Sequence, residues 1–271
     1  MYSSTNDLLV LGSAILKSTL LSPAQTRRWM KPVTHTSSIT ASVGAPWEIF
    51  RVPTKRGVID LYTKRGDLGV YAGIIVLCPD YDIGFTILSA ATRESIADAS
   101  VTVLADIITQ TLLPAVEAAA KDNAASTFAG TYKATNGINS SITFIVDDGP
   151  GLRVQQWVSN GTDVLEEYLV LNQATGDGLT TSVRLYPTNL QSFKSQAGFV
   201  DKMAFRAVFE VFPKNVDTGA FSQNCATWDV VDDVMYGSIA IDEFLFQFNQ
   251  AGDAISVEPR IFRITLLKEA P

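Results

Sequence analysis

The sequence has few of the residues that metal centres and hydrolytic triads require. Its 271 residues include one histidine and two cysteines. A zinc or iron site usually needs several such ligands, so neither metal is expected. We interpret the single histidine, His35, as a solvated residue of the polar stretch 34–38 (THTSS), although such a loop can border a cleft. Cys78 and Cys225 either pair or remain buried thiols, and the sequence leaves both alternatives open.

Positive charge is also scarce, and this limits the partners. There are 21 lysine and arginine residues against 28 aspartate and glutamate residues, a formal net charge of −7. No basic stripe alternates with aromatic residues, so no nucleic-acid partner is expected. No uninterrupted apolar run reaches the roughly 18 residues that indicate a membrane-spanning helix, so no membrane partner is expected. No Gly-rich phosphate loop precedes a helix, and no cofactor is expected. Secreted and cytoplasmic locations both stay open.

Residues 1–125 combine helical and strand patterns, which predicts helices packed on an antiparallel sheet. Ser4 or Thr5 can cap a first helix, and Pro23 opens a second. Apolar strand-like segments follow at 47–52, 58–63, 70–77 and 83–89. A long helix is predicted over 93–120, and Pro114 should kink or end it. The residues predicted to face inward from that helix are Ile96, Val103, Ile107, Ile108 and Leu112.

Residues 126–271 have a different period and predict an antiparallel barrel. The polar stretch 121–126 is predicted to be a linker between the two domains. Short alternating segments lie at 130–134, 141–146, 152–159, 164–171, 180–186, 202–212, 226–231, 242–248, 254–258 and 261–267. Seven aromatic residues either line a small-ligand cavity or fill the barrel, and filling is the more common case: Trp157, Tyr168, Phe205, Phe209, Trp228, Phe244 and Phe246.

Several segments resemble the class C β-lactamase-related serine hydrolases. Residues 2–9 (YSSTNDLL) and 20–23 (LLSP) resemble two helix starts of that family, and 30–32 (MKP) resembles the Met-x-x-Pro segment that follows them. Residues 61–71 (LYTKRGDLGVY) are similar to its third catalytic box, Lys-Thr-Gly or His-x-Gly, followed by a Gly-rich turn. The hairpin 77–88 (LCPDYDIGFTIL) is similar to its next two strands. Pieces of the second half resemble the β-rich C-terminal domain of fungal members: 225–228 (CATW), 236–237 (YG) and 242–246 (DEFLF).

The resemblance implies an α+β fold. Residues 1–125 would be the C-terminal portion of a serine β-lactamase-like domain, a partial layer of helices on an antiparallel sheet. Residues 126–271 would be an all-β, lipocalin-like antiparallel barrel. In that family the serine of a Ser-x-x-Lys box attacks an acyl carbon, and the tyrosine of a Tyr-x-Asn box helps to relay protons. Neither box occurs here. We therefore expect no catalytic residue in this chain and interpret it as a fragment or truncated member.

Lys64, Arg65 and Gly66 are the substrate-binding residues that the resemblance implies. Lys64 would place a positive charge beside a substrate anion. Gly66 would let the strand approach the substrate closely, because a side chain there would collide with it. Arg65 stands where the family usually has threonine or serine. This departure from the family pattern argues against recognition of a β-lactam carboxylate. The alternative is that Lys64 and Arg65 form an exposed charge pair near a turn.

Two classes of function follow from these observations. The first is acyl-enzyme hydrolysis of an ester, amide or lactone by a full-length parent. The second is a non-hydrolytic small-molecule-binding or repurposed biosynthetic protein that uses the barrel or the exposed half-cleft. We expect the exposed face of residues 1–120 to bind either another copy of the chain, which would form an oligomer, or a missing N-terminal segment. Carboxylates at 147–148 or 232–233 suit either a Ca²⁺ site or simple turns, and no resident metal is expected.

Overall fold

The chain divides into two compact units. The computed structural model describes residues 2–171, 177–194, 199–212, 228 and 230–270. Unit 1 is Met1–Ala120 and unit 2 is Lys121–Pro271. Unit 1 mixes helices with an antiparallel sheet, and unit 2 is mainly β-structure.

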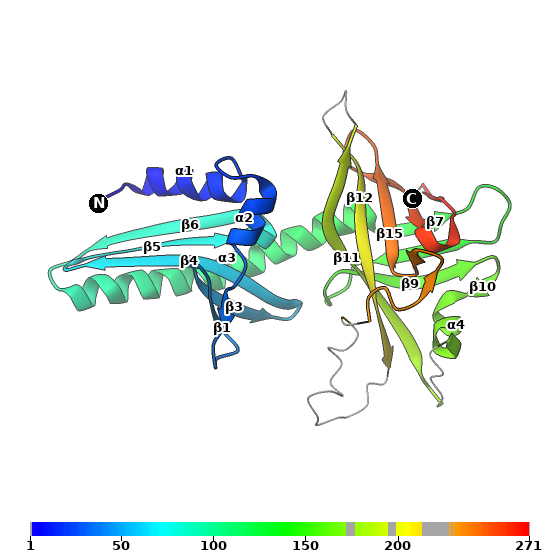
Figure 1. Ribbon diagram of the computed structural model, residues 1–271, viewed down its shortest axis with the longest axis horizontal. Coiled ribbons are helices and arrows are strands. Elements are labelled where there is room, and N and C mark those ends of the chain that lie inside the picture. Colours follow the sequence, from blue (N-terminus) through cyan, green and yellow to red (C-terminus); the bar gives the residue numbers. More distant parts are fainter. Residues whose placement is uncertain (1, 172–176, 195–198, 213–227, 229, 271) are drawn as a thin grey trace. The chain divides into compact units, whose positions relative to one another are not determined.

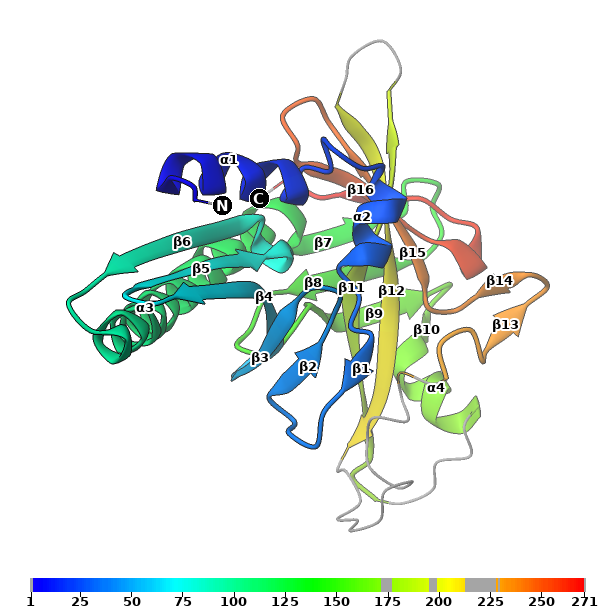
Figure 2. The ribbon, with the colours of Figure 1, turned by 60° about the vertical axis from the view of Figure 1, so that its left-hand side comes forward.

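Unit 1 is built around a six-stranded antiparallel sheet in which each strand pairs with the next along the chain (Figure 1). Helices α1 and α2 cover one face of this sheet, and helix α3 covers the other (Figures 1 and 2). The elements are α1 Thr5–Leu16, α2 Pro23–Trp29, β1 Thr34–His35, β2 Ala41–Val43, β3 Glu48–Thr54, β4 Gly57–Leu68, β5 Tyr71–Cys78, the short 3-10 helix η1 Pro79–Tyr81, β6 Ile83–Ala90 and α3 Glu94–Phe128.

Local capping explains the two short helices, and both predictions are confirmed. The Ser4 hydroxyl accepts a hydrogen bond from the backbone N–H of Asp7 at 3.2 Å, which satisfies one free donor at the start of α1. At the start of α2, Ser22 and Gln25 form a reciprocal capping box, and Pro23 occupies the first turn.

Helix α3 is longer than predicted and begins in unit 1 and ends in unit 2. The stretch 121–126 is helical and not an irregular linker, although the two units divide at its start, between Ala120 and Lys121. The physical reason is the alanine content around it, since alanine has the highest helix propensity: Ala118, Ala119, Ala120, Ala124 and Ala125. The helix also continues through Pro114 instead of ending there.

The face that α3 presents to the sheet also differs from the prediction. Ala97, Val101 and Leu113 are its buried residues. Ile108 packs against the same cluster, but Ile96, Val103 and Ile107 are 47%, 55% and 54% exposed. Large apolar residues occur around much of this helix, so periodicity alone selected the wrong stripe. The small residue Ala97 allows the helix to lie close to the sheet.

By length and composition, α3 is also apolar enough to cross a membrane. The search for an uninterrupted apolar run did not detect this, because acidic residues such as Asp98 and Asp106 interrupt the helix. The same length and composition also occur in helices that pack in a protein core.

Unit 2 contains a closed antiparallel barrel of eight described strands (Figure 1). They are β7 Gly130–Lys133, β8 Ser141–Ile145, β9 Leu152–Ser159, β11 Thr180–Phe193, β12 Val200–Phe212, β15 Glu243–Phe248, β16 Ala254–Pro259 and β17 Leu266–Lys268. The barrel closes because β17 pairs with β7 and β8 pairs with β9. Shorter elements are β10 Thr162–Asp163, α4 Val164–Leu171, β13 Met235–Tyr236, β14 Ile239–Ala240 and the 3-10 helix η2 Arg260–Phe262.

The predicted strand over 164–171 is instead helix α4, and the prediction is wrong. The Asp163 carboxylate accepts hydrogen bonds from the backbone N–H groups of Leu165 and Glu166 at 2.8 and 3.3 Å, which caps a helix. Val164 and Tyr168, four residues apart, are its buried residues. Of the strand predicted over 226–231, residues 226, 227 and 229 lie outside the described residues, and Trp228, Val230 and Val231 are helix and turn, so the prediction of a strand is wrong for these three.

Aromatic side chains fill the interior of the barrel. Phe246 is fully buried, and its ring centroid lies 5.0 Å from that of Phe205 and 5.4 Å from that of Phe144. Phe128, at the end of α3, places a further ring 5.1 Å from that of Phe246. The aromatic residues identified from the sequence therefore form core, except Trp228, which is 53% exposed. A cavity beside Tyr168 measures about 20 Å³, which suits about one water molecule.

One partly buried ion pair ties a turn to the barrel wall. Arg184 donates two hydrogen bonds to the Asp147 carboxylate, at 2.9 and 2.7 Å, and a third to the backbone oxygen of Pro150 at 3.0 Å. Gly149 makes room for it, because a Cβ there would lie 2.6 Å from the guanidinium. The Arg184 hydrogen bonds are the main cause that lowers the pKa of Asp147 from 3.8 to about 2.

We predict that Phe246→Ala lowers the free energy of unfolding by about 3 to 5 kcal/mol, because it leaves a cavity among packed rings. Phe193→Ala is the matched control, since Phe193 is 61% exposed and should change stability by less than about 0.5 kcal/mol. Urea denaturation followed by tryptophan fluorescence measures both. Equal losses for the two variants would contradict a packed barrel interior.

The Asp147 pair predicts a pH dependence of stability. Because the pKa in the folded state is depressed, the carboxylate stabilises the fold above about pH 4 and loses this effect as pH falls towards 2. The difference in unfolding free energy between the wild type and Asp147→Asn should therefore shrink over that range. Asp122→Asn, on an exposed helical position, serves as control. A difference that stays constant with pH would count against this role.

Candidate functional site

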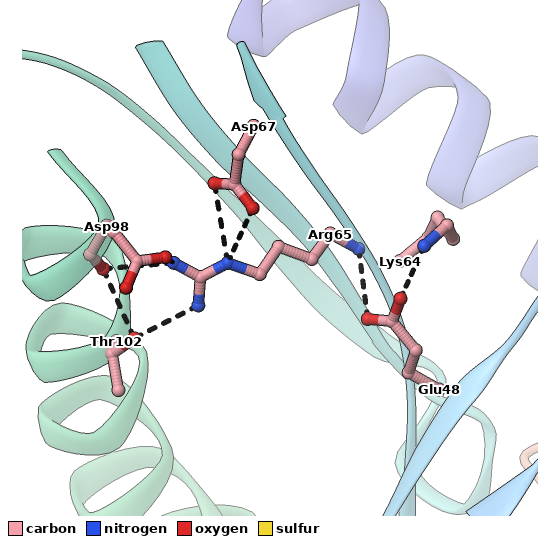
Figure 3. A network of polar contacts seen from close by, with 6 residues as sticks. All are labelled: Glu48, Lys64, Arg65, Asp67, Asp98 and Thr102. Atoms are coloured by element: carbon pink, nitrogen blue, oxygen red, sulfur yellow. Dashed lines mark hydrogen bonds and ion pairs between the residues drawn. The ribbon is translucent and has the colours of Figure 1, made fainter. Parts of the chain in front are cut away.

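The three predicted site residues lie on two different faces of the sheet. They are Lys64, Arg65 and Gly66 of strand β4. Along β4, Ile59 and Leu61 pack in the cluster under α3, whereas Tyr62 packs in the cluster under α1 and α2. Because side chains alternate along a strand, Lys64 and Gly66 belong to the α1 and α2 face, and Arg65 belongs to the α3 face. Figure 3 shows the Arg65 side chain directed to α3 and Lys64 directed elsewhere.

Arg65 is held by contacts within unit 1. Its guanidinium forms an ion pair with Asp98, donates to the Asp98 backbone oxygen at 3.0 Å and donates to the Thr102 hydroxyl at 3.0 Å (Figure 3). Its Nε donates to Asp67 at 3.2 Å. The side chain is 25% exposed. These contacts tie β4 to α3, so the Arg65 side chain has a structural role in the described chain.

Lys64 pairs with a neighbouring carboxylate. Its ammonium group forms an ion pair with Oε1 of Glu48, the first residue of β3. The other carboxylate oxygen, Oε2, accepts a hydrogen bond from the backbone N–H of Arg65 at 3.2 Å. The Lys64 and Glu48 side chains are 45% and 43% exposed. The lysine is thus available at the surface but is neutralised by a residue of the same unit.

An apolar pocket of about 660 Å³ lies on the face of the sheet that α1 and α2 cover. Its lining is almost entirely apolar and includes Leu11, Leu20, Trp29, Trp47, Ile75 and Leu88. Lys64, Arg65 and Gly66 also contribute to its wall. A pocket of this size and composition suits a small organic molecule whose orientation is set by a few polar groups.

Paired glycines leave the backbone of the sheet bare in the wall of this pocket. Gly66 of β4 lies opposite Gly73 of β5. A Cβ at Gly66 would meet no atom within 4 Å, and neither glycine has the positive φ that favours glycine. At Gly73 a Cβ would lie 2.8 Å from Cδ2 of Leu88. Nothing within the described chain requires glycine at position 66, so a collision there would involve a bound molecule.

Two tryptophans shape one side of the pocket. The Trp29 indole N–H donates to the backbone oxygen of Ala45 at 2.7 Å, and its ring centroid lies 5.0 Å from that of Trp47. Trp47 is buried, and its indole N–H has no hydrogen-bond partner among the described residues. Burial of these rings fixes the segment that leads into Glu48.

Sequence reasoning did not identify Glu48, Trp29 or Trp47 as site residues. A signal for Glu48 was present in the hairpin formed by β3 and β4. Its tight turn pairs Thr54 with Gly57, and counting outwards places Glu48 opposite Thr63, beside Lys64. The apolar residues of α1 and α2 carried no such signal, because the same pattern describes an ordinary helix face.

The remaining candidates lie away from this site or have other contacts. His35 is exposed, and its Nδ1 lies 2.9 Å from the Ser42 hydroxyl. Cys78 is a buried free thiol, and burial is the main cause that raises its pKa to about 11, so it is a poor nucleophile. Cys225 lies outside the described residues.

The two acidic turns considered for Ca²⁺ bind arginine instead. Asp147 binds Arg184, and Asp232 forms an ion pair with Arg206, which also pairs with Asp242 at 2.8 Å. Among the residues with described positions, no group of three or more His, Cys, Asp or Glu side chains is arranged to hold a metal ion.

Residues 120–270 match a known family, described as beta-lactamase-like-like, C-terminal domain. The match spans more than half of the chain, so the chain belongs to this family. The beta-lactamase-like protein of Arthroderma benhamiae is 27% identical over 99% of this chain and 49% of its own length. The probable hydrolase clz13 of Cochliobolus lunatus is 30% identical over 71% of this chain and 31% of its own length. These names indicate a hydrolase-like family in fungi.

The chain therefore spans between about a third and a half of the length of the curated relatives it matches. Among solved structures, the octameric penicillin-binding protein homologue from Pyrococcus abyssi aligns with a TM-score of 0.30 and 16% identity. That alignment covers 98% of this chain and 47% of the other.

We predict different consequences for two neighbouring cations. Arg65→Gln removes the tie to α3 and should lower the free energy of unfolding by about 1 to 2 kcal/mol. Lys64→Gln removes an exposed ion pair and should cost less than about 0.5 kcal/mol. Urea denaturation measures both values. A Lys64 variant as destabilised as the Arg65 variant would show that Lys64 is a structural residue.

Proposed function

We propose that this chain forms the substrate-binding wall of a β-lactamase-like serine hydrolase that acts on an ester, amide or lactone. The observation that carries the proposal is the position of Lys64 and Gly66 on one face of β4, in the wall of the apolar pocket. Membership of a hydrolase-like family supports it. Under this proposal unit 1 is part of a serine β-lactamase-like layer, and the barrel of unit 2 is lipocalin-like.

The acylating serine would come from residues outside this sequence. The sequence has no Ser-x-x-Lys and no Tyr-x-Asn box, and serine acyl transfer needs a nucleophile activated by a neighbouring base. The Arthroderma relative is about twice as long as the segment that this chain matches. We therefore propose that the chain is a fragment or truncated member, with a binding role and no acyl transfer of its own.

Each part of the wall has a distinct task in this proposal. The apolar lining would hold the hydrocarbon part of the substrate by removing it from water. The bare backbone at Gly66 would let a flat group approach the sheet without meeting a side chain, whereas the Leu88 side chain lies over Gly73. The Lys64 ammonium would stabilise negative charge on the substrate at the edge of the pocket.

The second candidate function is non-hydrolytic binding of a small apolar molecule. The size and apolar lining of the pocket favour it, and it needs no nucleophile. The described interior of the barrel is filled by aromatic side chains, so the binding site in this alternative is the half-cleft of unit 1. Covalent labelling distinguishes the two functions, because only a hydrolase reacts with an acyl-enzyme probe.

We also propose that the exposed face of residues 1–120 binds a second copy or a missing N-terminal segment. Ile96, Val103 and Ile107 expose apolar surface on α3, which is unusual for a surface without a partner. Sedimentation velocity tests self-association. A monomer at all concentrations would remove the second copy as the partner.

We predict that the chain alone forms no adduct with a fluorophosphonate probe, as measured by intact mass. It should nevertheless bind methyl cis-parinarate, a neutral fluorescent ester, without hydrolysing it. Gly66→Val should reduce this affinity at least tenfold, because the new side chain enters the pocket. The variant should fold, since valine suits a strand and no described atom obstructs its Cβ.

Ala90→Val is the matched control for this experiment. It adds the same side chain at an exposed position of β6 that does not line the pocket. A labelled chain would overturn the binding-only role. Unchanged binding by Gly66→Val would show that the ester binds elsewhere.

A further inference from the structure

Strand β4 extends beyond the strand that precedes it in the sheet. The first residue of β3, Glu48, pairs with Thr63, whereas β4 continues to Leu68. Among the described strands, residues 64–68 of β4 therefore pair on one side only, with β5. The backbone N–H of Arg65 lies on the unpaired edge, because it donates to a side chain and not to a strand. An edge of this kind presents donors that a ligand can use.

The Glu48 carboxylate occupies this edge. One oxygen pairs with the Lys64 ammonium and the other accepts from the Arg65 N–H at 3.2 Å (Figure 3). An ammonium group and a backbone N–H thus share one carboxylate, which is the geometry that stabilises an anion through charge-assisted hydrogen bonds. Both donors belong to residues that also line the apolar pocket. Glu48 is not among the lining residues.

We propose that Glu48 is an internal competitor at a carboxylate site formed by Lys64 and the Arg65 N–H. The ligand of this site would be an amphiphile whose carboxylate replaces that of Glu48 and whose apolar body lies in the pocket. The inference rests on the proposed function for the binding of the apolar body and for the role of Lys64 beside a substrate anion, and it adds the residue that opposes this binding.

The contacts of Glu48 allow its side chain to be displaced without breaking the fold. Its backbone is fixed between β2 and β4, so only the side chain needs to move. The ion pair with Lys64 is nearly half exposed, and exposed pairs contribute little to stability. When the side chain leaves, its charge is solvated, and the ligand carboxylate restores the balance at Lys64. Arg65 cannot supply a second cation, because its side chain is bound to Asp98 on the opposite face.

An internal competitor lowers the apparent affinity of the ligand by the fraction of time that the site is free. Removing the Glu48 carboxylate should therefore strengthen binding of a carboxylate and leave binding of a neutral analogue unchanged. Removing the Lys64 ammonium should weaken binding of the carboxylate alone. A purely structural Glu48–Lys64 pair would affect both analogues equally, through stability.

The experiment compares cis-parinarate, a fluorescent fatty carboxylate, with its neutral methyl ester. We expect Glu48→Gln to raise the affinity for cis-parinarate five- to tenfold and to change that for the ester less than twofold. Lys64→Gln should lower the affinity for the carboxylate at least fivefold and spare the ester. Asp60→Asn is the matched control: it removes the same charge from the ion pair with Arg51, on the same two strands, and should change neither affinity. Circular dichroism confirms that each variant is folded.

Three outcomes would overturn the inference. Glu48→Gln could leave the affinity for cis-parinarate unchanged, or Asp60→Asn could raise it equally, which would indicate a general charge effect. Lys64→Gln could also have no effect on either analogue. If ester binding persists in these cases and is lost in Gly66→Val, the proposal that the pocket binds the ester would still hold. Failure of the wild-type chain to bind either analogue would instead overturn the proposed function together with this inference.

Discussion

The period of two along strand β4 is the constraint on which the candidate site depends. Adjacent side chains of a strand point to opposite faces, so the side-chain charges of Lys64 and Arg65 cannot both contact one ligand. One face presents Lys64 and Gly66 to an apolar pocket, and the other presents Arg65 to α3. Because of this alternation, Lys64 belongs to the binding surface and the next residue, Arg65, makes a structural contact. Arg65 holds the strand against the helix, and pairing with β3 and β5 sets the register of the face that carries Lys64.

The pocket exists because α1 does not approach the sheet uniformly. Near one end, Gly12 of α1 comes close to β5, where a Cβ would lie 3.0 Å from Cδ2 of Leu77. Further along the same face, Gly66 has no side chain and a Cβ there would meet no atom within 4 Å, whereas the Leu88 side chain lies over Gly73. Close contact at one place and missing side chains at the other leave an apolar space between helix and sheet. The space therefore follows from the missing side chain at Gly66, where the backbone does not have the positive φ that favours glycine.

The two units differ in what they contribute. The family match lies on unit 2, whose barrel is closed by strand pairing and filled by aromatic rings. In the described part of this barrel, aromatic side chains occupy the interior. The described pocket with room for an organic molecule lies in unit 1, next to the segment that resembles a catalytic box. The family match and the candidate site thus lie in different parts of the chain.

The sequence determined the features that depend on local order. Ser4, Ser22 and Pro23 were sufficient to place the first two helices, and alternating apolar residues were sufficient to predict an antiparallel barrel. It left α4 misassigned, because the apolar residues of 164–171 also fit a strand, although Asp163 is a local cap that indicates a helix. It also misplaced the buried stripe of α3, where large residues occur on several sides. Tertiary structure alone decided which apolar residues were covered and that Glu48 lies against Lys64. The physical reason is that burial and ion pairing depend on which surfaces meet in space, whereas caps and strand periods depend on neighbours along the chain.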